Sequence, residues 1–279
     1  MFARRTKPKF ASLSVNGTML SHPGCVREVN EDVVAYALSC AGDPSGGRGM
    51  LALVADGLGG HAAGEVASWI AADTVMRLCE ELEGPQPDVL AACLAEANRL
   101  ICERSEVEAA CAGMGTTCTV LVVRDDTAFL AHIGDSRAYL LRDGRLRQIS
   151  EDHSLVAQLV RDGAITEEEA LRSPHRHVIV RALGLEPSVK PFIPRKGMLL
   201  QGGDVLVLCS DGLSDVVDDE TIAATVARLP PAEACQELLD QALAAGGTDN
   251  ISVGVFAVAR LRSEPETPRD TVPRAGGSP

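Results

Sequence analysis

The residues best suited to chemistry are three aspartates placed beside short apolar runs. Asp56 follows the run LALVA, Asp211 follows VLVLCS, and Asp249 lies just before ISVGVF. Short apolar runs of this kind predict buried strands, so each carboxylate is expected at a strand end. A carboxylate in that position is costly unless a cation pairs with it. The three aspartates therefore indicate a cation site.

Asp56 and Asp211 are each followed by glycine, and an Asp-Gly pair is more often only a tight turn. The chain has two further pairs of this kind, at Asp143 and Asp162. We interpret Asp143 as a hairpin turn between two strand-like runs and Asp162 as a helix end. Asp56 and Asp211 differ because each closes a buried strand.

Two more acids, Glu31 and Asp32, lie in the segment VREVNED. Clustered carboxylates raise one another's pKa unless a cation neutralises them. Carboxylate ligands without Cys or paired His select hard ions such as Mg²⁺, Mn²⁺ or Ca²⁺. No EF-hand loop and no H-E-x-x-H motif occurs, which excludes those calcium and zinc sites. The C-x₅-R spacing occurs only in the expected helix at 88–104 and along the expected strand at 117–123, not in a loop, and no G-x-S-x-G elbow occurs, so a covalent mechanism has no support.

Hydrophobic periodicity predicts the elements that position these acids. The expected helices cover residues 63–83, 88–104, 153–162, 219–228 and 232–245. The expected strands cover residues 51–55, 117–123, 128–133, 138–141, 146–149, 205–209 and 251–258. Segment 42–49 is expected to be a turn or loop between two strands, and segment 164–190 to be irregular. Strands in hairpin-like succession before and after a helical pair favour an α+β fold with antiparallel sheets.

Composition allows a single large domain. The chain has 279 residues, of which 46% are hydrophobic and only 3% aromatic, so its core must consist of Ala, Val, Leu and Ile. We predict a basic N-terminal arm at residues 1–10, one domain at 11–260 and a disordered tail at 261–279, which is rich in Pro, Gly and charge.

Charge and cysteine usage exclude several classes of protein. The net charge of −13 repels a nucleic-acid backbone, so we expect no nucleic-acid partner. The nine cysteines are an odd number without a C-x-x-C pair, which favours a reducing compartment. The basic N-terminus lacks the apolar stretch of a signal peptide, and no segment has the apolar length of a membrane span. We therefore expect a cytoplasmic protein that does not contact membranes.

Six short motifs in order resemble the metal-dependent protein phosphatases of the type 2C (PPM) family, with the bacterial branch as the nearer match. The resemblance extends from about residue 12 to residue 259, and its strength lies in the complete ordered set rather than in any one motif. The motifs are GCVREVNED (24–32), VADGLGGH (54–61), MGTT (114–117), IGDSR (133–137), SDGL (210–213) and GTDN (247–250).

This resemblance implies a four-layer α-β-β-α sandwich, in which two antiparallel sheets are flanked by helices. It also implies roles for eight residues of this chain. Asp56 bridges two Mn²⁺ or Mg²⁺ ions, the Gly57 carbonyl binds one of them, and Asp211 and Asp249 complete the shell of the second. Glu31 and Asp32 hold waters on the metals or ligate directly. Asp135 shares a third ion with Asp211, and Arg27 binds the substrate phosphate through its fork of donors.

The implied activity is hydrolysis of phosphoserine and phosphothreonine in proteins, by in-line attack of a hydroxide held between two ions. The expected partners are phosphorylated proteins, a bacterial Ser/Thr kinase and the substrates of that kinase, and the expected state is a monomer. Two alternatives stay open. One is a catalytically weak or inactive regulatory module with the same fold. The other is a phosphatase of a different target, such as an anti-sigma-antagonist regulator or a small phosphoester.

One departure from the eukaryotic members concerns the proton donor. Their histidine two residues after the bridging aspartate is replaced here by Leu58, as is common in bacterial members. His61 could be offered instead, although we favour a structural role at a helix start for it. A water on the metal is the remaining alternative.

Other polar residues near the motifs are expected to support the structure rather than the chemistry. His132 is interpreted as a core histidine, and His153 as a structural or helix-capping residue. Bracing roles are assigned to Thr116, Thr117, Ser136 and Arg137. Segment 164–185 corresponds to the family's variable flap, where substrate contact is expected for His175, Arg176 and His177.

Overall fold

The computed structural model of the protein describes residues 13–38, 49–59, 63–84 and 86–260. Its strands are β1 (Leu13–His22), β2 (Asp32–Leu38), β3 (Gly49–Leu58), β4 (Gly115–Thr116), β5 (Cys118–Arg124), β6 (Thr127–Ile133), β7 (Arg137–Arg142), β8 (Arg145–Gln148), β9 (Met198–Leu199), β10 (Val205–Cys209) and β11 (Ile251–Arg260). Its helices are α1 (Ala63–Glu81), α2 (Gln86–Val107), α3 (Leu155–Arg161), α4 (Glu167–Leu171), α5 (Asp211–Ser214), α6 (Asp219–Arg228) and α7 (Pro231–Ala244), with a short 3₁₀ turn at Ala109–Cys111.

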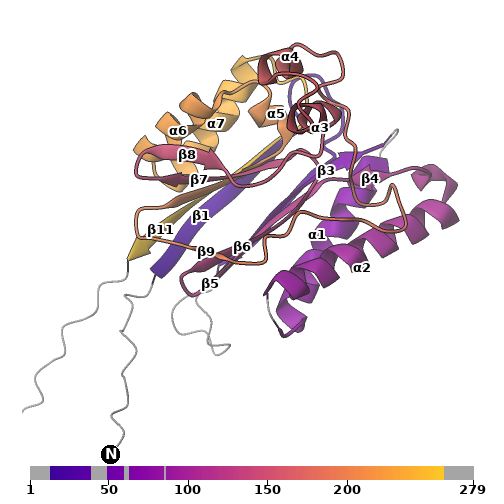
Figure 1. The fold of residues 1–279 in the computed structure, drawn as a ribbon, viewed down its shortest axis with the longest axis horizontal. Coiled ribbons are helices and arrows are strands. Elements are labelled where there is room, and N and C mark those ends of the chain that lie inside the picture. Colours follow the sequence, from indigo (N-terminus) through magenta and orange to yellow (C-terminus); the bar gives the residue numbers. More distant parts are fainter. Residues whose placement is uncertain (1–12, 39–48, 60–62, 85, 261–279) are drawn as a thin grey trace, which may run out of the picture.

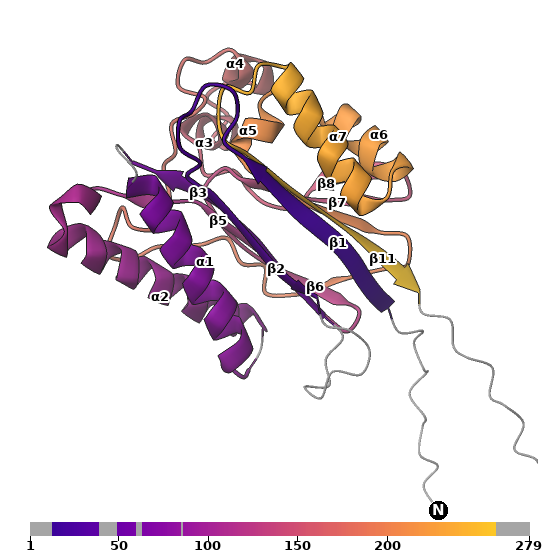
Figure 2. The same cartoon turned by 180° about the vertical axis from the view of Figure 1, so that it is seen from behind.

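The strands form two antiparallel sheets that face each other. One sheet has the order β1-β11-β10-β7-β8, and the other has the order β2-β3-β5-β6-β9, with β4 paired to the end of β3. Figure 1 shows helices α1 and α2 over the outer face of the second sheet, and α6 and α7 over the outer face of the first. Figure 2 shows the same layers from behind, with β1 and β11 side by side. The predicted four-layer sandwich is confirmed.

Alternation along the strands divides the core into three apolar layers. In β3, Leu51, Leu53 and Ala55 pack against α1 and α2, while Met50, Ala52 and Val54 point into the space between the sheets. In β10, Leu206 and Leu208 fill the same central layer, and Val207 and Cys209 pack toward α6 and α7. Alternate residues of a strand point to opposite faces of its sheet, and both faces are covered here. The buried strands are therefore continuous apolar runs in the sequence.

Most of the predicted elements are confirmed within a few residues, and the exceptions have physical reasons. Strand β1 was not predicted, because its residues LSVNGTMLSH alternate with Ser, Asn and Gly instead of forming an apolar run. Segment 164–190 is irregular except for α4, which begins with a capping box between Thr166 and Glu169. Residues 42–48, the arm at 1–10 and the tail at 261–279 lie outside the described residues.

Two observations bear on the environment of the chain. Within the described ranges, no helix combines the length and the apolar content that a membrane crossing requires. The described cysteines are all free thiols, most of them buried.

Candidate metal centre

Two of the predicted site aspartates face each other directly across a strand pair. Asp32 begins β2 and lies opposite Asp56 of β3 in an unbroken antiparallel register. Both continue the set of side chains that points between the sheets, because Val34 and Val54 two residues away pack in the central layer. Like charges opposite each other destabilise a strand pair. A cation between the sheets would relieve this repulsion.

Hydrogen bonds fix the backbone that carries Asp56. Its N–H donates to Thr117 Oγ1 at 2.9 Å, and its carbonyl accepts from Thr116 Oγ1 and from the Thr117 N–H, both at 2.9 Å. The strand therefore continues through Asp56 to Leu58, instead of ending at Ala55 as the sequence predicted. The bracing role predicted for the two threonines is confirmed.

The second strand end brings Asp211 to the same place. Asp211 is the first residue of the short helix α5, immediately after β10, and Ser210 donates a hydrogen bond of 2.7 Å to Asp32. Gly212 allows this approach, because a Cβ there would lie 1.9 Å from the Asn250 carbonyl oxygen. The glycine in the SDGL motif is thus required by the contact between α5 and the loop before β11.

Asn250 ties the N-terminal acids to the C-terminal aspartate. Its side chain accepts from the Glu31 N–H at 2.8 Å and donates to the carbonyls of Pro23 at 3.0 Å and Val29 at 2.9 Å. Asp249, the preceding residue, accepts from Arg27 Nη2 at 2.7 Å. Asn250 belonged to a motif in the sequence, but its role as the clamp of the 23–31 loop was not predicted.

Glu31 and Gly57 lie against the start of α1. A Cβ on Gly57 would lie 2.3 Å from the Gly64 carbonyl oxygen, and one on Gly64 would lie 2.7 Å from Glu31 Oε1. The Glu31 carboxylate is thus packed at the N-terminal end of a helix, where the helix dipole favours negative charge. Burial nevertheless raises the pKa of Glu31 above its ordinary value, with the Gly64 N–H opposing that shift.

The turn that carries Asp135 is held from behind by a buried histidine. The His153 N–H donates to the Gly134 carbonyl at 2.7 Å, and the Gly134 N–H donates to His153 Nδ1 at 3.2 Å. Ser136 Oγ lies 2.8 Å from Thr117 Oγ1, which joins this turn to β3. These contacts confirm that His153 and Ser136 are structural.

Burial and mutual repulsion raise the pKa values of the gathered aspartates. Burial, followed by the charges of Asp211 and Asp249, raises the pKa of Asp32 to about 7. Burial and the charge of Asp211 raise the pKa of Asp135 to about 8. The pKa of Asp211 rises to about 6 through burial and then the charge of Asp215, and burial with the charge of Asp32 raises the pKa of Asp56 well above its ordinary value. The cluster is electrostatically unfavourable without cations.

Two carboxylate oxygens supply a further test of whether the cluster suits divalent ions. Asp32 Oδ1 and Asp135 Oδ1 are buried and have no hydrogen-bond partner among the described residues. A buried polar atom without a partner is rare and costs free energy. The unsatisfied oxygens and the absence of sulfur ligands fit hard cations such as Mn²⁺ or Mg²⁺. The residues present therefore fit the implied metals.

The flap segment contributes one side chain to this cluster. His177 Nδ1 lies 3.0 Å from Asp215 Oδ2, and ligand atoms of His177, Asp211 and Asp215 all lie within 4.8 Å of one another. Asp215 was not among the predicted site residues. The sequence held one sign of this role. Asp215 follows Asp211 by four residues at the start of a helix, and residues at that spacing share a helix face.

Of the remaining polar residues named in the sequence analysis, some support the fold, and the predicted roles of the others are not tested by the structure. His132 is buried and bonds Thr119 Oγ1 at 2.8 Å, which confirms a core histidine. Arg137, two residues after Asp135, forms an ion pair of 2.8 Å with Asp152. His61 lies outside the described residues, and His175 and Arg176 are exposed on the flap.

The raised pKa values predict a pH dependence of stability in the presence of chelator. Asp135 has an ordinary pKa of 3.8 and a folded value of about 8. The folded state holds this proton more tightly, so the stabilising contribution is complete below about pH 4 and is lost as pH rises through about 8. We expect Asp135→Asn to stabilise the chelated protein at pH 8, by on the order of 1–3 kcal/mol, and progressively less toward pH 5.

Urea unfolding at the two pH values measures this difference. Asp143→Asn is the matched control, because Asp143 is exposed in the β7–β8 turn with a φ of 50°, which Asn also adopts readily. A variant at Asp135 that is less stable than the wild type at pH 8 would contradict the electrostatic interpretation.

The fold is a two-sheet sandwich with an acidic site at one end, and comparison with known proteins gives its family. The family model described as Protein phosphatase 2C matches residues 28–245. The chain is 44% identical over 242 residues to the serine/threonine protein phosphatase PstP of Mycobacterium tuberculosis, covering 85% of this chain and 44% of PstP. It is 35% identical over 250 residues to protein phosphatase PhpP of Streptococcus pneumoniae, covering 86% of this chain and 96% of PhpP. This chain belongs to the protein phosphatase 2C family.

A solved structure supports the same assignment. The catalytic domain of PstP in complex with two manganese ions superposes with a TM-score of 0.76 at 40% identity, covering 88% of this chain and 99% of that domain. The chain covers 44% of the length of full PstP.

Proposed function

We propose that this protein is a metal-dependent protein serine/threonine phosphatase. The observation that carries the proposal is the pairing of Asp32 with Asp56 at one end of the inter-sheet layer, where a buried Asp32 oxygen has no described partner. Such an arrangement is unfavourable unless divalent cations neutralise it. The family membership and the manganese bound by the PstP catalytic domain support the same conclusion.

The proposed ligands of two Mn²⁺ or Mg²⁺ ions come from four segments of the chain. Asp56 would take the bridging role, and the Gly57 carbonyl would bind one of the two ions. Asp211 and Asp249 would hold the second ion, and Glu31 and Asp32 would hold waters on the metals or ligate directly. Asp135 and Asp211 are the candidates for a third ion. When bound, these ions lower the pKa of water and polarise the phosphate, which supplies a nucleophile at neutral pH.

Arg27 is the proposed phosphate-binding residue. Its side chain is 51% exposed and pairs with Asp249 through Nη2. That contact raises the pKa of Arg27 further and uses one of its donors, while a guanidinium has five. The remaining donors can bind two phosphate oxygens as a fork. Arg27 therefore orients the phosphate at the rim of the carboxylate cluster.

The leaving oxygen of serine or threonine needs a proton. Leu58 ends β3 beside Gly57 and has no proton to transfer. We therefore assign the proton to water in the site, since a structural role at a helix start is favoured for the other candidate, His61.

The proposed substrates are proteins phosphorylated on serine or threonine by a bacterial kinase. A regulatory module without activity is not favoured, because every aspartate of the proposed metal set is present. The free thiols of the described residues fit a reducing cytoplasm. We further propose that a single domain spans residues 11–260, because β1 and β11 pair along their whole length and join its two ends. The monomeric state stays a prediction.

Hydrolysis of a phosphothreonine peptide with Mn²⁺, and again with excess chelator, tests the proposal. We expect turnover that requires the metal and returns when the metal is restored. Equal turnover in chelator would contradict the assignment.

A further inference from the structure

A hollow opens into the inter-sheet layer at the edge opposite β1 and β2. It has a volume of about 350 Å³ and lies between the edge strands β8 and β9. Ala128 and Leu130 of β6 belong to the central apolar layer, and Ile149 and Met198 pack against that layer. The hollow is therefore an opening into the sandwich core rather than a cleft between loops.

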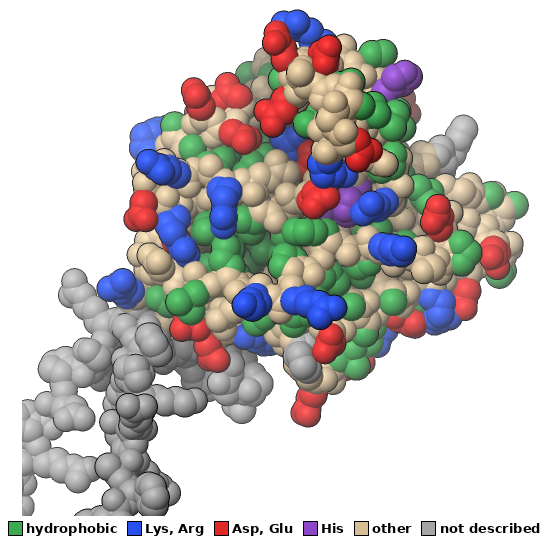
Figure 3. Space-filling view, in the orientation of Figure 1, with side chains coloured by type: hydrophobic (Ala, Val, Ile, Leu, Met, Phe, Trp, Pro, Cys, Tyr) green, Lys and Arg blue, Asp and Glu red, His purple; other side chains and the backbone are tan. Residues whose placement is uncertain are grey.

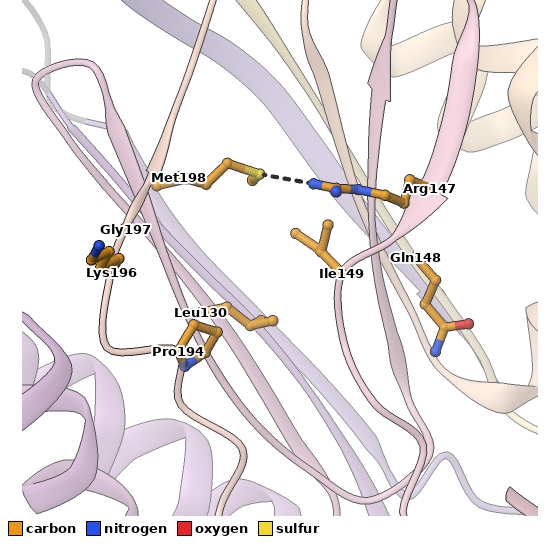
Figure 4. A pocket seen from close by; sticks show the side chains of 9 residues that line it. Leu130, Arg147, Gln148, Ile149, Pro194, Lys196, Gly197 and Met198 are labelled. Atoms are coloured by element: carbon orange, nitrogen blue, oxygen red, sulfur yellow. Dashed lines mark hydrogen bonds between the residues drawn. The ribbon is translucent and has the colours of Figure 1, made fainter. Parts of the chain in front are cut away.

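The rim of this hollow is cationic. Arg147 and Lys196 line it, and no acidic residue does. Arg147 shares a strand face with Arg145 and Ile149, because Leu146 between them packs toward the outer helices. Figure 4 shows Arg147 and Met198 reaching toward each other, with a contact of 3.9 Å between Nη2 and Sδ.

The cations of the rim are available to a partner. Arg145, Arg147 and Lys196 are exposed, as is Arg195 next to Lys196 in the chain, and over the described ranges none of them pairs with a carboxylate. By contrast, Arg142 on the neighbouring strand is fully engaged by Asp204. Figure 3 shows the result as an apolar hollow surrounded by blue side chains. The rim is thus locally positive in a chain whose net charge is −13.

Hydrogen bonds link the lining of the hollow to the strand that follows the Asp135 turn. Gln148 in that lining donates to Asp152 at 2.6 Å, and Asp152 binds Arg137, two residues after Asp135. A second, separate cavity of about 390 Å³ is lined by Ile133, Arg181 and Lys190, with Glu186 as the acidic residue of its lining.

From this geometry we propose that the hollow is a docking site for an acidic segment, carrying an apolar anchor residue, of the phosphoprotein substrate. The inference rests on the proposed function for the identity of the partner. Charge complementarity and the small apolar volume argue for an extended peptide, whose alternate side chains would enter the hollow and face the rim. The tail at 261–279 fits less well, since its three acidic and three basic residues cancel.

Binding of a labelled, unphosphorylated peptide of alternating Glu and Leu to the full chain tests the proposal. We expect binding that weakens with added salt, and no comparable binding of the same peptide with Lys in place of Glu. The double variant Arg147→Glu, Lys196→Glu should bind at least about tenfold more weakly. The double variant Arg77→Glu, Arg104→Glu is the control, because both residues are exposed on α1 and α2, which cover the outer face of the β6–β9 sheet, away from the hollow.

A kinetic arm distinguishes docking from catalysis. A phosphothreonine peptide extended by the Glu-Leu segment should have a KM at least about tenfold lower than one extended by a Lys-Leu segment. The rim variant should lose that advantage, with unchanged hydrolysis of an aryl phosphate. Peptide binding is also measured in chelator, where no metal is available. A protein that binds the Glu-Leu peptide but hydrolyses no phosphopeptide with Mn²⁺ would contradict the proposed function and leave the docking site standing.

Three results would overturn the docking proposal. The first is equal binding of the Glu and Lys peptides, and the second is wild-type affinity in the rim variant. The third is sedimentation of the wild type as a dimer and of the rim variant as a monomer, which would assign the hollow to a second copy of the chain.

Discussion

Asp56→Asn should lower kcat/KM for an aryl phosphate with Mn²⁺ by at least about a thousandfold. Asp56 faces Asp32 across β2 and β3, and the charges of Asp211 and Asp135 also reach it. An amide keeps the shape of the side chain but removes the charge that would bridge two ions. Asp143→Asn makes the same chemical change in an exposed turn and should keep activity within about twofold.

The activity loss can be separated from unfolding. Asp56→Asn removes one of several repelling carboxylates, so the chelated variant should melt at or above the wild-type temperature. A variant that melts normally and retains more than about a tenth of the activity would exclude Asp56 as the bridging ligand.

Mn²⁺ at about a hundred times its dissociation constant should raise the melting temperature of the wild type by about 5–10 °C at pH 8. The reason is that cations bind the folded cluster and relieve the repulsion that raises the pKa values of Asp32 and Asp135 to about 7 and 8. Differential scanning calorimetry with Mn²⁺ and with chelator measures the shift.

The same variants control the thermal experiment. Asp56→Asn should lose most of the shift, and Asp143→Asn should keep all of it. A wild-type melting temperature that is unchanged by Mn²⁺ would mean that the carboxylates do not form a site in the folded protein.

The sequence predicted the parts of the site that depend on strand ends. Asp56 and Asp211 could be found because each follows a buried apolar run, and Asp143 could be set aside because it joins two hairpin strands. What no local pattern shows is the pairing of Asp32 with Asp56, since that register is decided by packing of both strands in two layers.

The supporting residues were harder to predict for a related reason. Asn250 bonds three groups of the 23–31 loop, more than two hundred residues away in the chain. Asp215 meets His177 only because the flap folds over α5. Strand β1 was not predicted because its polar residues interrupt the apolar pattern, although it pairs with β11 through all ten residues. Such long-range contacts are not encoded in spacing along the chain.

A Mn²⁺ titration followed by the electron paramagnetic resonance signal of free Mn²⁺ tests the central claim most directly. We expect the wild type and Asp143→Asn to bind at least two ions, and Asp56→Asn and Asp211→Asn to bind fewer, with weaker affinity. Equal stoichiometry and affinity in all four proteins would contradict a metal centre built from these aspartates.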